Sequence, residues 1–131
     1  MDIGIKNAKI AEGNNYINLD LKYLNDLSGG DKNFVSEIIE MFIHDVPEII
    51  EQTQDFLLKH DFDLLRITVH KLKSSVQVLG GHGLVALIQE IESQSKDPEI
   101  FDVLVQKIAR LKEGLFQMVD QLKKELTILK S

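Results

Sequence analysis

The chain contains no cysteine and no tryptophan, and it has only two prolines in 131 residues. Without thiols it can form no disulfide bond and offers neither a thiolate metal ligand nor a cysteine nucleophile. No apolar run is long enough to cross a membrane, and the opening stretch MDIGIKNAKIAEGNN does not look like a signal peptide. These absences are compatible with an intracellular setting, and we expect a cytoplasmic protein.

Positive charge is also scarce. Fifteen Lys and Arg residues stand against 21 Asp and Glu residues, which gives a formal net charge of -6. Non-specific binding to nucleic acid or to an anionic membrane needs a basic surface, so we expect neither partner. Any useful positive patch must therefore be local.

The dominant pattern is helical periodicity, with few strand-type alternations. The length suits one domain, and a hydrophobic content of 44% is enough for a single core. We read residues 1–18 as a flexible N-terminal arm and residues 19–131 as the domain. The predicted fold class is all-α: an antiparallel four-helix bundle with a short additional N-terminal helix.

The short helix is expected near residues 18–30, with Gly29 and Gly30 ending it. Asp31 is a good N-cap for a long helix that ends near His60. Pro47 falls inside that helix, and the stretch DVPE could instead open a new one with a capping box. Because the apolar stripe keeps its phase, we favour one kinked helix. The stripe comprises Phe34, Val35, Ile38, Ile39, Phe42, Val46, Ile49, Ile50, Phe56 and Leu57.

Three more helices follow. The second long helix starts at about Asp61 and stops at the stretch GGHG, the third covers about 84–95, and the fourth starts at Asp97, Pro98 and Glu99. Their apolar residues recur at spacings of three and four, as bundle packing requires. The positions expected inside are Leu65, Val69, Leu72, Val76 and Leu79; then Leu84, Leu87, Ile88 and Ile91; then Leu104, Ile108, Leu111, Leu115, Met118, Leu122, Leu126 and Leu129.

His70 falls on the opposite face of its helix from these buried positions. Residues three and four apart share a helix face, so His70 lies beside Arg66, Ile67, Lys73 and Ser74. This face is cationic in an acidic protein, and the small Ser74 leaves room above the ring. An anionic group on a second protein, with phosphate the obvious candidate, could reach the imidazole. The simpler interpretation is a solvated helix face with an incidental histidine.

The stretch HKLKSSVQVLGGHGLVALIQEIE resembles the signature of histidine-containing phosphotransfer (HPt) domains. It has a histidine, a hydrophobic residue two positions on, a lysine three positions on and small residues at the next two positions. A Leu-Gly helix end follows, and then a helix closing on a hydrophobic-glutamate pair. With the order and length of the surrounding helices, the resemblance covers about residues 19–129.

The resemblance implies a relay in which His70 takes a phosphoryl group from the aspartate of one receiver domain and passes it to another. Neutral imidazole suits this role because its ordinary pKa is roughly 6.5. Lys73 would neutralise a phosphoryl oxygen, and Glu92 would orient the imidazole. The residues expected to contact the partner are Arg66, Lys71, Ser74 and Gln77. The family usually has glycine where this chain has Ser74, which could narrow the partner range.

The implied partners are response-regulator receiver domains and a hybrid sensor histidine kinase, and a monomer is expected. No cofactor is expected on this chain, because any Mg²⁺ should belong to the receiver. The competing hypothesis is a helical adaptor or dimerisation module whose His70 is never phosphorylated. A metal site is disfavoured, because no two of the histidines have the i, i+4 spacing of a helical zinc site. An ATP-dependent histidine kinase core would need a nucleotide-binding domain, which the chain is too short to contain.

Overall fold

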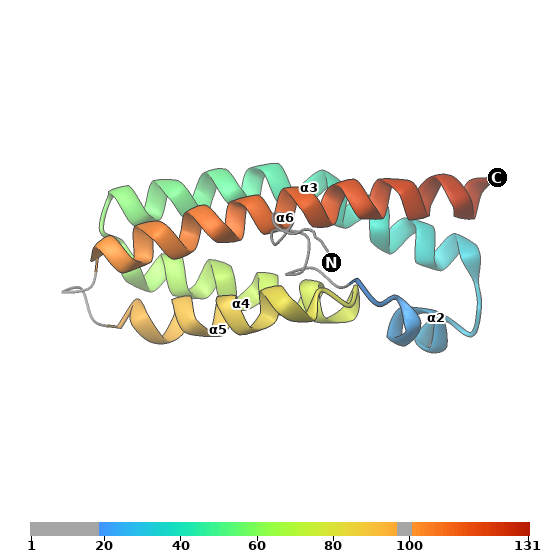
Figure 1. Cartoon of the computed structure of the whole chain (residues 1–131), viewed down its shortest axis with the longest axis horizontal. Helices are drawn as coiled ribbons and strands as arrows, with labels where there is room; N and C mark the ends of the chain where they lie inside the picture. Colours follow the sequence, from blue (N-terminus) through green and yellow to red (C-terminus); the bar gives the residue numbers. More distant parts are fainter. Residues whose placement is uncertain (1–18, 97–100) are drawn as a thin grey trace, which may run out of the picture.

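The computed structural model describes residues 19–96 and 101–131, and these residues form five helices and no strand. The helices are α2 (Lys22–Ser28), α3 (Lys32–Leu58), α4 (Phe62–Val78), α5 (His82–Gln94) and α6 (Phe101–Lys130) (Figure 1). The predicted arm at residues 1–18 and the predicted helix start at 97–99 lie outside the described residues. None of the described helices is long and apolar enough to span a membrane.

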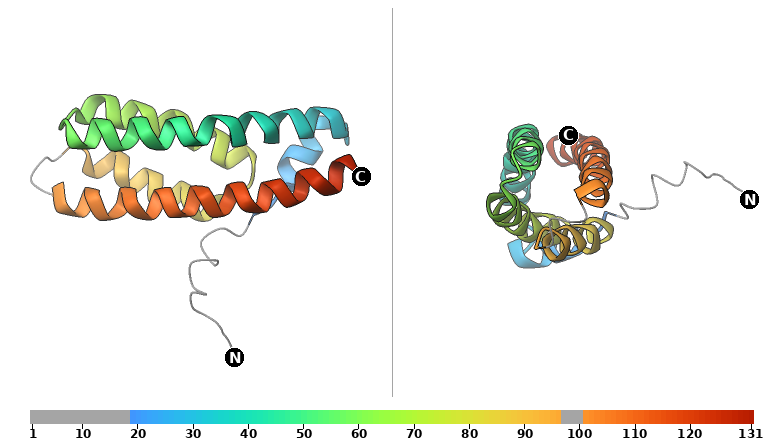
Figure 2. Two further views of the ribbon diagram at one scale, coloured as in Figure 1. Left: turned by 90° about the horizontal axis from the view of Figure 1, so that it is seen from above. Right: turned by 90° about the vertical axis from the view of Figure 1, so that its left-hand side faces the viewer.

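The four long helices form an antiparallel bundle, which confirms the predicted fold class. Successive helices run in opposite directions, and the end-on view shows them around a common centre (Figures 1 and 2). Helix α3 packs against α4 and α6, and α5 packs against the same two helices. Helix α4 therefore lies between α3 and α5.

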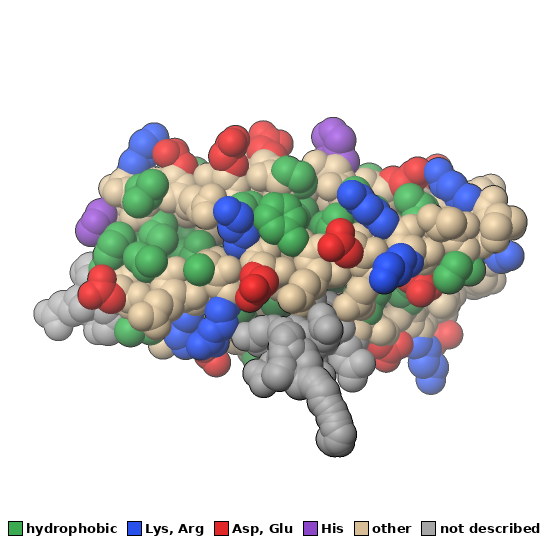
Figure 3. All heavy atoms as spheres, turned by 45° about the horizontal axis from the view of Figure 1, so that its top comes forward, with side chains coloured by type: hydrophobic (Ala, Val, Ile, Leu, Met, Phe, Trp, Pro, Cys, Tyr) green, Lys and Arg blue, Asp and Glu red, His purple; other side chains and the backbone are tan. Residues whose placement is uncertain are grey.

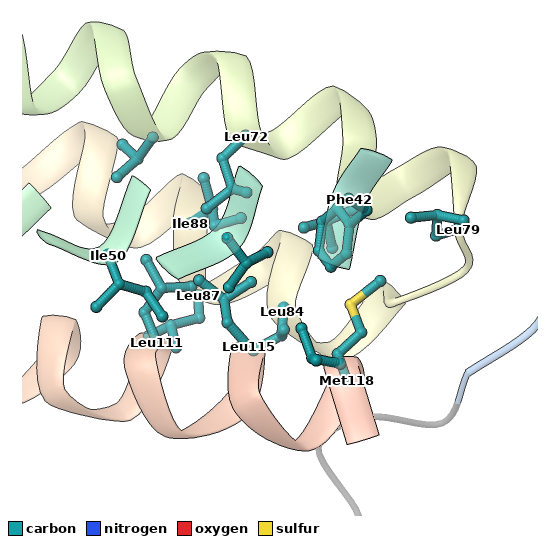
Figure 4. Packing of buried hydrophobic residues seen from close by; sticks show 14 of the residues in the cluster. Phe42, Ile50, Leu72, Leu79, Leu84, Leu87, Ile88, Leu111, Leu115 and Met118 are labelled. Atoms are coloured by element: carbon teal, nitrogen blue, oxygen red, sulfur yellow. The ribbon is translucent and has the colours of Figure 1, made fainter. Parts of the chain in front are cut away.

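The core fills the space between the four helices, and its residues come from all of them (Figure 4). All five positions predicted to point inward from α4, Leu65 to Leu79, are at most 2% exposed. The four positions predicted for α5 are buried as well. Because the buried side of α4 is so well defined, the rotation of this helix about its axis is fixed, and with it the direction of His70.

The predicted apolar stripes are not evenly buried. Ile38, Ile49 and Phe56 are half-buried, and at one end of the bundle Leu126 and Leu129 are half-buried and Phe34 is 40% exposed. At this end α3 and α6 extend beyond α4 and α5, so fewer neighbours are present to cover their apolar residues (Figure 1). The periodicity identified the inward face of each helix but not how far its partners reach.

The predicted ends of α2 and α3 are confirmed. Gly29 adopts the left-handed conformation that ends α2, and the Asp31 carboxylate accepts hydrogen bonds from the backbone N–H groups of Asn33 and Phe34. A single helix passes through Pro47, so the alternative of a new helix starting at DVPE is wrong. The missing N–H of Pro47 costs one helical hydrogen bond, whereas buried residues on both sides of it hold the helix together.

The turn between α4 and α5 is shorter than predicted. The stretch GGHG was read as a turn and α5 was expected from about Leu84, but the helix already begins at His82. Gly80 has a φ of +79°, and its carbonyl accepts a hydrogen bond from the backbone N–H of Asp20 at 3.1 Å. The segment leading into α2 is therefore attached to the end of α4.

Helix packing explains why a glycine, Gly114, stands inside α6, which the sequence does not reveal. A Cβ atom at this position would lie 2.5 Å from Cδ2 of Leu84, which is fully buried. The glycine thus lets α5 and α6 approach closely, and this packing compensates for its weak helix propensity, which costs about 1 kcal/mol.

The face formed by α3 and α6 carries no large patch of one charge. Figure 3 shows acidic and basic side chains interspersed over it, with hydrophobic side chains between them. One ion pair, between Lys130 Nζ and Glu40 Oε2 at 2.7 Å, joins the two helices across this face. The face therefore gives no electrostatic reason to place an anion-binding site there.

A pair of glycine substitutions tests whether the contact with Asp20 holds α2 in place. Gly29→Ala and Gly80→Ala both put a side chain at positive φ, at a cost of about 1–2 kcal/mol. The new methyl at position 29 meets nothing within 4 Å, whereas at position 80 it would lie 1.8 Å from the Asp20 backbone oxygen. We expect Gly80→Ala to lower the free energy of unfolding by roughly 1–3 kcal/mol more than Gly29→Ala in urea titrations. Equal losses would show that the contact contributes nothing.

Candidate functional site

His70 lies on the outer side of α4, between two buried neighbours. Val69 and Leu72 are at most 2% exposed and face the core, so His70 must point outward. Its side chain is 65% exposed. The prediction of an accessible histidine on this face is confirmed.

A glutamate from the next helix holds the imidazole from one side. His70 Nδ1 lies 2.6 Å from Oε2 of Glu92, and Lys73 Nζ donates to Oε1 of the same carboxylate at 2.7 Å. The side chains of Glu92 and Lys73 are 17% and 19% exposed, so the bond between them is largely shielded from water, whereas the imidazole is exposed. One carboxylate therefore binds two neighbouring groups of α4, one through each oxygen.

The packing of α5 on α4 places Glu92 at this position. Ile88 and Ile91 are fully buried in the core, and Glu92 follows directly after Ile91. Glu92 consequently lies at the boundary between α5 and α4, where it reaches His70 and Lys73. Although His70 is exposed, the bridge holds its ring against the packed part of the bundle.

The bridge decides which ring nitrogen is free. An ionised carboxylate only accepts hydrogen bonds, so Nδ1 must carry the hydrogen of the bond to Glu92. In neutral imidazole the other nitrogen, Nε2, then has a free lone pair. Nε2 has no hydrogen-bond partner among the described residues. The site thus presents a fixed, nucleophilic nitrogen at the protein surface.

Glu92 remains ionised at neutral pH. Burial alone would raise its pKa, but the hydrogen bonds from Lys73 and His70 outweigh this effect and hold the pKa below its ordinary value of 4.5. The lowered pKa matters because a protonated Glu92 could not accept hydrogen bonds from both groups in this arrangement.

The other residues predicted at the site are not all brought together. Arg66 turns away from His70 and binds Asp63 at 2.6 Å, with a longer hydrogen bond to Ser95 at 3.4 Å. Lys71 is exposed and has no carboxylate partner among the described residues. The predicted cationic patch is therefore weaker than the sequence suggested, because Arg66 and Lys73 each have an acidic partner.

Ser74 lies at the rim of an apolar groove that the sequence reasoning missed. The groove runs between α3 and α4, and Ser74 and Val78 also line a second hollow beside it. Gln77 is exposed and lines this second hollow. The first groove is formed by Ile38, Met41, Phe42, Asp45, Ile49, Leu72, Ser74, Ser75, Val78 and Leu79, and the second by Tyr23, Ser74, Gln77, Val78 and His82.

Met41 in the groove and Tyr23 in the second hollow are 60% and 56% exposed. Both could have been noticed in the sequence, because each is a large apolar or aromatic residue that lies outside the predicted apolar stripe. What the sequence could not supply is that α2 and α3 bring them to the same side as Ser74.

Of the remaining histidines, His82 lines the second hollow with Ser74, whereas His44 and His60 line neither the groove nor this hollow. His44 and His82 are exposed on α3 and at the start of α5, and His60 stacks on Phe101 with ring centroids 4.5 Å apart. Within the described ranges, no three His, Cys, Asp or Glu residues are arranged to hold a metal ion.

Comparison with known proteins agrees with this geometry. The family model of the Hpt domain matches residues 37–129, which include α4, α5 and most of α3 and α6. The chain therefore belongs to the HPt domain family, the phosphotransfer modules of two-component systems. The expectation raised by the HKLKSS stretch is confirmed at this level.

Two solved structures are similar to the chain. One is the HPT domain of a sensor hybrid histidine kinase from Shewanella, with 26% identity, a TM-score of 0.73, and coverage of 86% of this chain and 97% of that one. The other is a putative histidine-containing phosphotransfer protein from rice, with 20% identity, a TM-score of 0.71, and coverage of 92% and 88%. The rice protein supports the fold alone. A search of curated proteins gave no match.

The depressed pKa of Glu92 gives a pH-dependent contribution to stability. Because the folded pKa lies below the unfolded one, the contribution is present above the unfolded value of about 4.5 and is lost as the pH falls through the folded pKa. Glu92→Gln should lower the free energy of unfolding by about 1–2 kcal/mol at pH 7. The difference from wild type should shrink between pH 5 and pH 3.

Urea titrations across this pH range measure the effect, and Glu90→Gln on the same helix is the matched control. Glu90 pairs with Lys107 of α6 and is more exposed, so its replacement should cost less. A wild-type advantage over Glu92→Gln that stays constant down to pH 3 would contradict the assignment.

Proposed function

We propose that the chain is a phosphorelay intermediate in which His70 accepts a phosphoryl group from a receiver aspartate and passes it to the aspartate of a second receiver. The observation that carries this proposal is the exposed imidazole whose Nδ1 is bound to Glu92 while Nε2 has no partner among the described residues. Membership of the HPt family and the similarity to the Shewanella domain support it.

The first half of the relay is an in-line displacement. The Nε2 lone pair attacks phosphorus, the N–P bond forms as the P–O bond to the receiver aspartate breaks, and the bonding electrons leave with the carboxylate. Such transfers pass through a loose transition state, so positioning and charge neutralisation supply most of the catalysis. This chain contributes the position of Nε2, and Lys73, which binds the same carboxylate as His70, would offer a cation for a phosphoryl oxygen.

Lys73 can serve in this role only by sharing its ammonium group. The ammonium already binds Glu92 Oε1, but it carries three donors and the carboxylate uses one of them in the structure. Its remaining donors can reach toward an incoming anion beside His70. Lys71 lies on the exposed side of α4 and would add positive charge at the rim.

The partner surface that we propose is the groove between α3 and α4 together with the hollow beside Tyr23. The groove is largely apolar, lies within one helical turn of His70 and meets it at Ser74. Ile67, on the other side of His70, is 50% exposed and extends the apolar surface. A receiver that covers this area would bring its aspartate pocket over the imidazole.

We place the partners in two classes, response-regulator receiver domains and a hybrid sensor histidine kinase, and we propose that the chain acts as a monomer in the cytoplasm. Mg²⁺ would be supplied by the receiver, whose carboxylates would bind it. In this scheme the chain supplies no ATP-dependent step of its own.

Phosphotransfer with and without His70 is the direct test. Labelled phosphate on a phosphorylated receiver domain should move to the wild-type chain and not to the His70→Ala variant, while circular dichroism shows both proteins equally helical. The bond formed should be labile in acid and stable in alkali, as expected for phosphohistidine. His44→Ala, which removes an exposed histidine that lines neither the groove nor the second hollow, is the matched control and should accept label normally.

The competing adaptor hypothesis gives the opposite result. If no member of a broad receiver panel transfers label to the folded wild-type chain, and His70→Ala still binds the partner of the wild type, the chain acts as a helical adaptor or dimerisation module.

Steric access at Ser74 gives a second test. Ser74→Leu should reduce the rate of transfer from the receiver by at least roughly tenfold, because a leucine at the rim would keep the partner from close approach. Ala109→Leu adds the same side chain to an exposed position of α6, which packs mainly against α3 and α5, and should leave the rate unchanged. A normal rate in Ser74→Leu would place the docking face elsewhere.

A further inference from the structure

The bond between Glu92 and Nδ1 has a consequence for the phosphorylated state. When Nε2 attacks phosphorus, the ring already carries a hydrogen on Nδ1 and becomes a cationic phosphoimidazolium. The fate of that proton then decides how easily the phosphoryl group leaves again.

In onward transfer, a carboxylate oxygen attacks phosphorus, and the electrons of the breaking N–P bond return to Nε2. If Nδ1 still holds its proton, the leaving group is neutral imidazole. If the proton has been lost to water, the leaving group is an imidazolate anion, which is a far stronger base and a poorer leaving group. This is why phosphohistidine is labile in acid and stable in alkali.

We propose that Glu92 keeps the proton on Nδ1 of phosphorylated His70 and so keeps the phosphoryl group ready for transfer. The inference rests on the proposed function of His70 and assigns Glu92 a part beyond orienting the ring. The carboxylate lies 2.6 Å from Nδ1 and its side chain is only 17% exposed, so the acceptor for that proton is held beside the ring although the imidazole itself is exposed. A negative charge at this distance favours the protonated ring.

Lys73 sets the strength of this effect. Its ammonium holds the second carboxylate oxygen and keeps Glu92 ionised, but it also withdraws part of the negative charge from the ring. No second carboxylate among the described residues forms a hydrogen bond or ion pair with His70. The other charged groups around the site are Arg66 paired with Asp63, the exposed Lys71, Asp45 in the groove on α3, and Glu90 paired with Lys107 on the α6 side.

The experiment uses phosphoramidate, a small phosphoryl donor that modifies histidine nitrogens without a receiver. The loss of phosphate from His70 is followed by ³¹P and long-range ¹H–¹⁵N NMR between pH 5 and pH 11, with the signal assigned by its absence in His70→Ala. Phosphorylated His82 serves as an internal reference, because it is exposed and forms no ion pair with a described carboxylate. The variants are Glu92→Gln, Glu90→Gln, Lys73→Met and the double variant Lys73→Met/Glu92→Gln.

Near pH 8 the wild type should lose phosphate from His70 roughly tenfold faster than Glu92→Gln, and its rate profile should lie at higher pH. Glutamine can still accept a hydrogen bond from Nδ1, so this variant removes the charge and keeps the orientation of the ring. The two rates should converge at low pH, where either ring is protonated. Glu90→Gln should follow the wild type, and the effect of Glu92→Gln should persist in the Lys73→Met background.

Equal profiles for wild type and Glu92→Gln would overturn the inference, as would an effect that disappears when Lys73 is replaced. Failure of phosphoramidate to modify His70 while it modifies His82 would also overturn it, because a free Nε2 is its premise. The proposed relay is judged separately by transfer from a receiver, so His70-dependent transfer combined with equal profiles would reject only the part assigned to Glu92.

Discussion

The carboxylate of Glu92 is the contact on which the site depends, because it joins α5 to two residues of α4 at once. Each of its oxygens serves one partner, Nδ1 of His70 or the ammonium group of Lys73. An exposed histidine would otherwise rotate freely and exchange its ring proton between two nitrogens. The bridge holds a surface side chain in place and leaves Nε2 as its defined free nitrogen.

The bundle supplies this contact through ordinary packing. The buried apolar stripes of α4 and α5 fix the rotation of both helices, and Gly114 lets α6 press closely on α5 at Leu84. At the C-terminal end of α4, Gly80 binds Asp20 and brings Tyr23 to the side of the groove that meets Ser74. The chemical site, on α4 and α5, and the groove proposed for the partner, between α3 and α4, therefore share α4.

Much of this could be predicted from the sequence, because helix faces follow from residue spacing. The inward positions of α4 and α5, the single helix through Pro47 and the exposure of His70 are consequences of periodicity alone. The bond between Lys73 and Glu92 could not be predicted in this way, since it depends on how two helices are placed along each other. The exposure of Phe34 could not be predicted for the same reason, because it depends on where α4 and α5 end.

The central claim, that His70 offers Nε2 while Glu92 holds Nδ1, is tested most directly by NMR of the chain phosphorylated by a receiver with ¹⁵N-labelled histidine. The account predicts one-bond ³¹P–¹⁵N coupling to Nε2 of His70, and a proton on Nδ1 before phosphorylation. Coupling to Nδ1 of His70, or to a nitrogen of His44, His60 or His82, would contradict it.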